Sequence, residues 1–125
     1  MEILMLNTKK LGLVLGAALL AAPFAASAAD APAAFNQCKA CHKVEAGKHG
    51  VGPSLFGVYG AKAGHAEGYK YSDNHVKSGM VWDDANLGKY LADPKATIPG
   101  NKMAFAGLKK PEDVAAVVAY LKTLK

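Results

Sequence analysis

The chain has 125 residues, enough for one domain, and carries a formal net charge of +5. All 15 basic residues are lysines, so the chain lacks the guanidinium fork that suits phosphates and guanine edges. No nucleic acid is therefore expected as a partner. The charge instead suits a surface that binds acidic proteins weakly and releases them quickly.

The first 29 residues are predicted to be a secretory signal peptide rather than part of the fold. A lysine pair, Lys9-Lys10, precedes an apolar run at 11–22, and the small residues Ala26-Ser27-Ala28 follow. This order of positive, apolar and small residues is typical of a signal peptide.

Cleavage is expected near Ala28 to Ala29. The domains are then a signal peptide, residues 1–29, and one mature domain, residues 30–125. Retention of the first segment as a membrane anchor is the alternative, although its apolar run is short for a bilayer span. We expect export and no stable membrane insertion after cleavage.

The first predicted helix covers residues 31–42, which are alanine-rich and place Phe35, Cys38 and His42 at helical spacing. The stretch 47–79 follows. It holds eight of the 13 glycines and shows no sustained periodicity. We interpret it as connected loops and turns.

Two further helices are predicted towards the C-terminus. One begins at Asp83-Asp84, which can cap it, and ends near Asp93-Pro94. The other begins at Pro111, a residue favoured in a first helical turn. The inner faces of the two helices are Leu87, Tyr90 and Leu91, and Val114, Val117, Val118 and Leu121.

These elements describe an all-α domain with three main helices and long loops. A mature chain of this size buries only a modest core, and loops of this length are uncommon in a small domain. A large flat apolar cofactor would fill the middle.

Cys38-Lys39-Ala40-Cys41-His42 is the attachment signature of a c-type haem. Two thiols three residues apart can bind the two vinyl groups of one haem, and His42 can then bind the iron. A thioredoxin-like redox pair would need a βαβ pattern, and a zinc site would need more ligands. A disulfide is geometrically poor at this spacing in a helix. We expect one covalent haem c with its iron.

The iron needs a sixth ligand. The candidates are His49, His65, His75, Met80 and Met103. Met103 is favoured because it follows a stiff Pro99-Gly100 turn that can hold a side chain without a helix. A His/Met ligand pair raises the reduction potential. It also leaves no vacant position for oxygen or peroxide, so the pair is typical of an electron carrier.

The mature chain resembles the class I c-type cytochromes, including mitochondrial cytochrome c and its soluble bacterial, periplasmic counterparts. The attachment motif is followed in order by Gly52-Pro53-Ser54-Leu55-Phe56-Gly57, Gly68-Tyr69-Lys70-Tyr71-Ser72-Asp73, Trp82, Tyr90-Leu91, Asp93-Pro94-Lys95, Ile98-Pro99-Gly100-Asn101-Lys102-Met103 and Ala119-Tyr120-Leu121-Lys122. The resemblance implies the small cytochrome c fold and a soluble, periplasmic, monomeric electron carrier that is not an enzyme.

The resemblance also implies roles for individual residues. His42 and Met103 would be the axial ligands, and the carbonyl of Pro53 would orient His42. Tyr71 and Trp82 would hydrogen-bond a buried propionate. Three further residues would complete the cofactor site: Tyr90 beside the methionine sulfur, Phe105 at the exposed haem edge, and Asn101, which replaces a hydroxyl residue near the propionates.

Lysines surround the exposed haem edge in this family. The corresponding set here, the docking lysines, is Lys39, Lys43, Lys95, Lys102, Lys109 and Lys110. They would steer the chain towards an acidic redox partner such as a cytochrome bc complex, a terminal oxidase or a dehydrogenase. The alternative function is a five-coordinate haem peroxidase or gas sensor, in which Met103 would not bind the iron.

Overall fold

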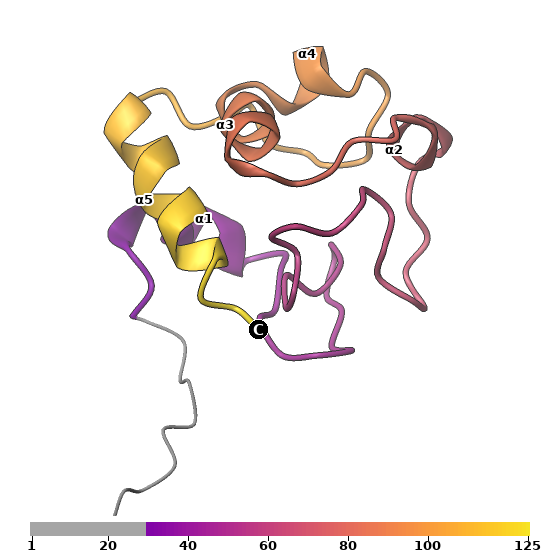
Figure 1. Cartoon of the computed structure of the whole chain (residues 1–125), viewed down its shortest axis with the longest axis horizontal. Coiled ribbons are helices and arrows are strands. Elements are labelled where there is room, and N and C mark those ends of the chain that lie inside the picture. The colour runs from indigo at the N-terminus through magenta and orange to yellow at the C-terminus, as the bar shows by residue number, and fades with distance from the viewer. Residues whose placement is uncertain (1–29) are drawn as a thin grey trace, which may run out of the picture.

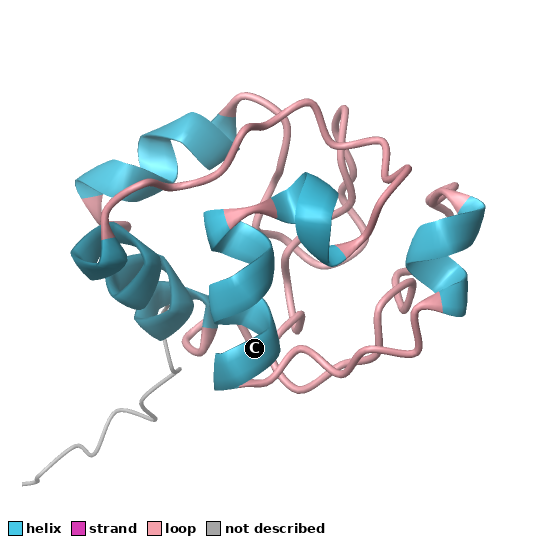
Figure 2. Cartoon of the chain, turned by 90° about the horizontal axis from the view of Figure 1, so that it is seen from above, coloured by secondary structure: helices cyan, strands magenta, loops and turns pink. Residues whose placement is uncertain are grey.

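The computed structural model describes residues 30–125, and the predicted signal peptide, residues 1–29, lies outside the described residues. Helices and loops make up this part of the chain, together with one isolated antiparallel bridge between Lys62 and Val81 (Figure 2). The helices are η1 (Ala33–Phe35), α1 (Asn36–Lys39), α2 (Asp73–Lys77), α3 (Asp84–Ala92), α4 (Pro94–Thr97) and α5 (Pro111–Leu121).

The N-terminal helix is shorter than predicted. Instead of one helix over 31–42, a turn of 3-10 helix follows Pro32 and continues into the four-residue α1. The turn nevertheless reaches His42, whose backbone N–H donates to the carbonyl of Cys38 over 2.9 Å. Cys38 and His42 are therefore held on one helical turn.

Helix α3 begins as predicted, because the side chain of Asp83 accepts a hydrogen bond from the backbone N–H of Asn86. Leu87, Tyr90 and Leu91 are its buried residues. The prediction that the helix ends near Asp93-Pro94 is confirmed. Pro94 then begins α4, in which Asp93 caps the N–H of Ala96.

Helix α5 has Pro111 in its first turn and buries Val117, Val118 and Leu121, while Val114 is half-buried. It packs against α3 and against η1, so the beginning and the end of the described chain lie next to each other (Figure 1). The ring of Phe35 meets Tyr120 edge to face, with the centroids 4.7 Å apart. This contact joins the two ends of the described chain, residues 30–125.

The middle of the chain is mostly loop, as predicted, but it contains one short helix. Helix α2 begins after Ser72, whose hydroxyl accepts from the backbone N–H of His75 over 3.1 Å. This loop-rich segment, α3 and α5 surround a core whose most enclosed side chains include Phe35, Ile98 and Val117.

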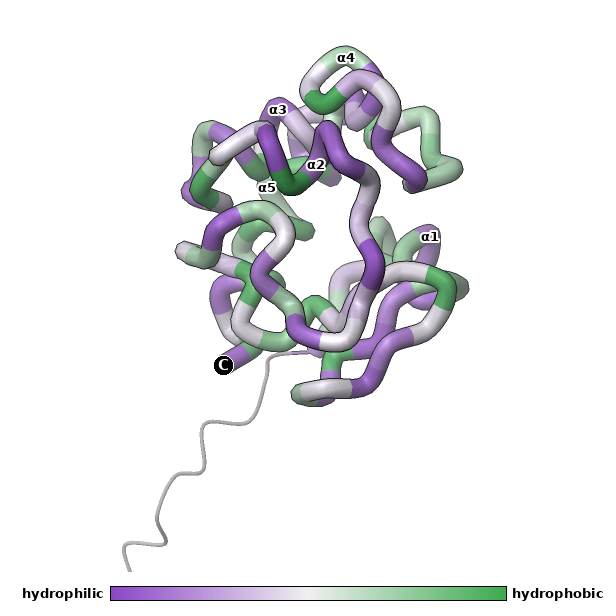
Figure 3. Tube along the Cα trace, turned by 90° about the vertical axis from the view of Figure 1, so that its right-hand side faces the viewer, coloured by the Kyte–Doolittle hydropathy of each residue, from purple (hydrophilic) through white to green (hydrophobic). Residues whose placement is uncertain are grey.

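Hydrophilic and hydrophobic residues are interspersed along the described chain (Figure 3). Among residues 30–125, no helix is both long and apolar enough to cross a membrane.

Candidate functional site

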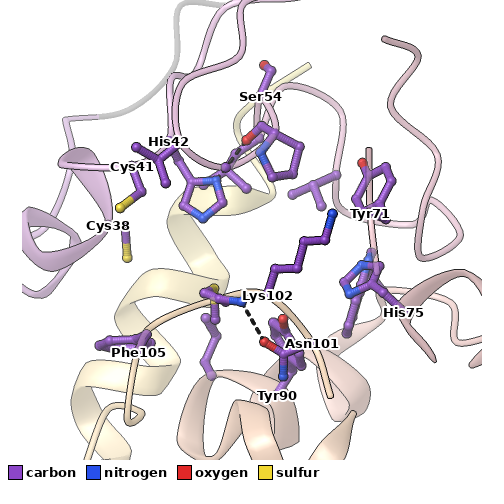
Figure 4. Close-up of a pocket in the computed structure, with 18 of the residues that line it drawn as sticks. Cys38, Cys41, His42, Ser54, Tyr71, His75, Tyr90, Asn101, Lys102 and Phe105 are labelled. Carbon is purple, nitrogen blue, oxygen red and sulfur yellow. Dashed lines mark hydrogen bonds between the residues drawn. The ribbon is translucent and has the colours of Figure 1, made fainter. Parts of the chain in front are cut away.

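A cavity of about 220 Å³ lies inside the fold. The Cys38–Leu55 stretch lines one wall, and Asn101–Phe105 lines the other, together with α3 and α5 residues. Its surface is mainly apolar and aromatic, with a few polar groups. Figure 4 shows Cys38, Cys41 and His42 across the cavity from Asn101, Tyr90 and Phe105. The attachment motif and the Met103 segment, far apart in sequence, thus line one cavity.

The two cysteine thiols lie side by side at one end of this cavity (Figure 4) and do not form a disulfide. Burial, followed by the nearby Cys41, raises the pKa of Cys38 to about 11. The thiol of Cys38 is therefore protonated at neutral pH. A nucleophilic thiol-disulfide exchange site needs a lowered pKa instead, whereas uncharged thioethers suit this buried position.

His42 has one ring nitrogen fixed by a hydrogen bond and one that makes no hydrogen bond within residues 30–125. Its Nδ1–H donates to the carbonyl oxygen of Pro53 over 2.7 Å. Burial lowers the pKa of His42, and the Pro53 bond opposes that shift. The neutral ring with its hydrogen on Nδ1 leaves the Nε2 lone pair free for a metal.

Gly52 allows this ring to lie where it does. A Cβ atom at position 52 would lie 2.4 Å from Cε1 of His42 and 2.8 Å from Nδ1. Both distances are far inside van der Waals contact, so any side chain there would displace the imidazole. The Gly52-Pro53 pair therefore provides both space and orientation for His42.

Met103 is half-buried, lines the cavity and packs against the core. Its backbone N–H donates to Oδ1 of Asn101 over 2.8 Å. The Nδ2 group of Asn101 donates to the carbonyls of Pro94, over 2.9 Å, and Ile98, over 2.8 Å. One asparagine side chain thus ties the Met103 segment to α4. Because both amide hydrogens are engaged, Asn101 is placed to hold this segment rather than to donate elsewhere.

Polar groups of three aromatic residues also line the cavity. The hydroxyl oxygen of Tyr71 accepts from the backbone N–H of Ala66 over 3.0 Å, which leaves its own hydrogen to donate. Burial raises the pKa of Tyr71, and raises that of Tyr90 to about 12. Within residues 30–125, the Trp82 indole N–H and the Tyr90 hydroxyl have no protein hydrogen-bond partner. Phe105 is half-buried in the same lining.

The docking lysines are all exposed. Lys102 also lines the cavity and donates from Nζ to the carbonyl of Lys70 over 3.2 Å. The ion pairs found among residues 30–125 use Lys48 and Lys122 instead. The positive charges of the docking lysines are thus not neutralised by a bound carboxylate in this part of the chain.

The other sixth-ligand candidates are distributed differently. Met80 packs against the core and His49 hydrogen-bonds to backbone groups, and neither lines the cavity. His65 is exposed at the lining, and His75 is half-buried in it. Sequence reasoning treated His75 only as one histidine among several. No local pattern indicated that α2 would bring it to the cavity.

The donor set fits a covalent haem. A mainly apolar cavity is lined by two thiols, one imidazole and one thioether. Within residues 30–125, Nε2 of this imidazole is free, and the donor hydrogens of Tyr71, Trp82 and Tyr90 have no acceptor. Within residues 30–125, no cluster of three or more His, Cys, Asp or Glu side chains is placed to hold a bare metal ion.

Comparison with known proteins gives the same picture. The profile of the cytochrome c family matches residues 28–125. The chain is 71% identical over 97 residues to cytochrome c2 iso-2 of Magnetospirillum molischianum, covering 78% of this chain and 100% of that protein. It is 66% identical over 97 residues to cytochrome c2 of Rhodoplanes tepidamans, covering 77% and 99% respectively. The solved structure of cytochrome cH from Methylobacterium extorquens aligns with a TM-score of 0.68 at 55% identity, covering 72% of this chain and 91% of that one.

Proposed function

The chain belongs to the class I c-type cytochromes and is a single-haem electron carrier, not an enzyme, and we propose that His42 and Met103 are the axial ligands of its haem. The fold is the small all-α cytochrome c fold. The cofactor is haem c, and Cys38 and Cys41 would form its two thioethers. The single observation that supports this ligand assignment is the shared cavity, which both side chains line. Within it, the carbonyl of Pro53 fixes Nδ1 of His42.

Bound haem supplies a one-electron ferric/ferrous couple. The protein residues keep the two iron-binding side chains in place. Pro53 orients His42, and Asn101 holds the backbone of Met103. If His42 and Met103 both bound the iron, no coordination position would remain for oxygen or peroxide. This distinguishes a carrier from a peroxidase or gas sensor.

The aromatic groups would hold and enclose the cofactor. Tyr71 has a hydroxyl hydrogen, and Trp82 an indole hydrogen, that no described protein group accepts. Both would donate to a buried propionate. Tyr90 would lie beside the methionine sulfur, and Phe105 would cover the haem edge. Exclusion of water from this apolar space limits the reorganisation that accompanies electron transfer.

The docking lysines would direct the haem edge towards acidic redox proteins. We propose a cytochrome bc complex, a terminal oxidase or a dehydrogenase as donor or acceptor. The lysines are exposed and unpaired with carboxylates among the described residues, so their field reaches an approaching partner and steers it.

The proposed location is the periplasm, reached as a monomer after removal of residues 1–29. The order of positive, apolar and small residues at the N-terminus supports export. The family match from residue 28 supports a mature domain of residues 30–125.

The visible spectrum of the haem-loaded protein tests the ligand assignment. Methionine ligation gives a weak far-red band in the ferric state. We expect the band in the wild type and in Met80→Ala, and its complete loss in Met103→Ala with the haem still covalently bound. A band that survives in Met103→Ala would exclude this ligand. Its absence from the wild type at neutral pH would favour a five-coordinate site.

A further inference from the structure

His75 is a titratable side chain in the cavity to which no function has yet been assigned. It comes from α2, and it lines the cavity with Tyr71, Trp82 and Tyr90. Figure 4 shows it beside Tyr71, on the wall across from Cys38 and Cys41. The residue is half-buried and belongs to neither the attachment motif nor the Met103 segment.

Aromatic rings surround the imidazole. It stacks on Tyr71 with the ring centroids 4.9 Å apart and an interplanar angle of 17°. Its centroid lies 5.8 Å from that of Trp82 and 6.0 Å from that of Tyr90. Among residues 30–125, no hydrogen bond uses either ring nitrogen of His75. The ring is thus held by packing, and its nitrogens remain available to bind a proton.

The protein side chains that face His75 within residues 30–125 carry no negative charge at neutral pH, and the buried propionate proposed to accept from Tyr71 and Trp82 would be the negative group beside them. Burial raises the pKa of Tyr71 and of Tyr90, so both phenols stay protonated, and Trp82 does not titrate. Tyr69 packs edge to face against Tyr71. The charged groups nearby are Asp73 and Lys77 on α2 itself, both exposed, and Lys102 on the cavity lining. No carboxylate makes an ion pair with His75 in the described chain.

We propose that His75 is a proton-binding residue coupled to the redox state of the haem: it takes up one proton when the iron accepts an electron and releases it on oxidation. The electron comes from the redox partner, and the proton exchanges with solvent. This inference rests on the proposed function. His75 acts on the iron through the charge of its bound proton and does not bind the iron.

The physical basis is the change of one unit of charge within the same enclosed space. Burial lowers the pKa of His75, because the charged ring loses hydration. The faces of Tyr71 and Trp82 partly replace that hydration through cation–π attraction. Loss of one positive charge at the iron on reduction favours the imidazolium, so the pKa of His75 is higher in the ferrous protein than in the ferric protein.

Linkage makes the effect reciprocal. If reduction favours protonation, then protonation favours reduction. The reduction potential therefore falls as pH rises between the two pKa values of His75, and it is flat on either side. Because burial lowers the pKa of His75, this slope is displaced towards acid pH.

The proposal is tested by measuring the reduction potential of the haem-loaded mature protein over a series of pH values. We expect the wild type to show a sloping potential, and His75→Asn to lose more than half of that slope. His65→Asn is the matched control, because it removes another histidine of the lining that is exposed, and it should keep the slope. An unchanged slope in His75→Asn, or its loss in His65→Asn, would overturn the assignment.

A second measurement needs no variant. Proton NMR of the His75 ring in the wild type gives its pKa in each oxidation state, and we expect the ferrous value to be higher. Equal values would refute the coupling even if His75→Asn failed to fold. The far-red ferric band separates this proposal from the proposed ligand set. The band reports Met103 and should persist in His75→Asn, whereas its loss there would make His75 part of the ligation.

Discussion

The imidazole of His42 and the carbonyl of Pro53 are joined by a 2.7 Å hydrogen bond in which Nδ1–H is the donor. The peptide group that contributes this carbonyl also contributes the N–H of Ser54. That N–H donates to Nδ1 of His49 over 3.0 Å, and Nε2 of His49 bonds to the carbonyl of Glu67 over 2.8 Å. One peptide group therefore connects the proposed iron ligand to the loop that contains Glu67.

Gly52→Ala tests the space beside His42. The new Cβ would overlap the imidazole, so we expect a loss of about 1 to 3 kcal/mol in the free energy of unfolding of the haem-loaded protein. Guanidinium denaturation measures it. Gly88→Ala is the matched control. Gly88 lies within α3, and a Cβ there meets nothing within 4 Å, so this change should stabilise the protein by roughly 0.5 to 1 kcal/mol. Equal effects of the two changes would contradict the steric argument.

Asn101→Ala removes the side chain that ties Met103 to α4. Three hydrogen bonds disappear, and partly buried groups are left unpaired at a cost of about 1 to 3 kcal/mol. We expect the far-red ferric band to vanish at a lower denaturant concentration than in the wild type. Asn74→Ala loses one bond to the carbonyl of Pro99 in the same segment and should shift the band less. A larger shift in Asn74→Ala than in Asn101→Ala would contradict the claim that Asn101 is the side chain that holds the Met103 segment.

Neutralising the docking lysines should slow encounter with an acidic redox partner. For Lys109→Gln we expect a second-order rate that is several-fold lower at low ionic strength and approaches the wild-type rate at high ionic strength, because salt screens the lost attraction. Stopped-flow mixing over a salt series measures this. Lys48→Gln is the control, since Lys48 is paired with Glu45. A wild-type rate that is independent of salt would rule out steering.

The pH dependence of stability should include a contribution from Asp84. Its pKa is lowered first by the hydrogen bond from Tyr59 and then by that from Lys122. A carboxylate with a lowered folded-state pKa stabilises the fold above its unfolded pKa, and this contribution is lost as pH falls through the folded pKa. Asp84→Asn should therefore be less stable than the wild type at neutral pH, and the difference should vanish in acid.

The carboxylate is exposed, so this effect is small and weakens with salt. Unfolding at a series of pH values checks it. Lys122→Met should lower the free energy of unfolding much less in the Asp84→Asn protein than in the wild type, because the ion pair with Asp84 is already absent there. Full additivity would show that the pair contributes nothing.

Phe35→Ala should remove the packing contact between the two ends of the domain and destabilise it. The Phe35 ring is 1% exposed and meets Tyr120 on α5, so its loss should cost about 3 to 5 kcal/mol of the free energy of unfolding. Phe56→Ala serves as the comparison, because Phe56 is 37% exposed and should cost far less. Thermal unfolding of both haem-loaded variants measures the difference.

Local chemistry determines part of the secondary structure. The start of α3 and the first turn of α5 follow from Asp83 and Pro111, whose capping and helix-starting chemistry acts within a few residues. Helices α2 and α4 are too short for a hydrophobic period. Their signals were the caps Ser72 and Asp93, the latter followed by Pro94. The N-terminal helix was predicted too long because Pro32 delays its start.

The sequence by itself determined the attachment site, because Cys38, Cys41 and His42 lie on one turn whose backbone bonds are local. The orientation of the His42 ring, in contrast, depends on Gly52 and Pro53. The tertiary structure decided what surrounds this turn. It placed Met103 and Asn101 on the opposite wall and brought His75, one of several candidate ligands, from α2 to the cavity lining. The reason is physical: which loops meet across a cavity depends on how α3, α5 and η1 pack, and no local pattern in the chain encodes that contact.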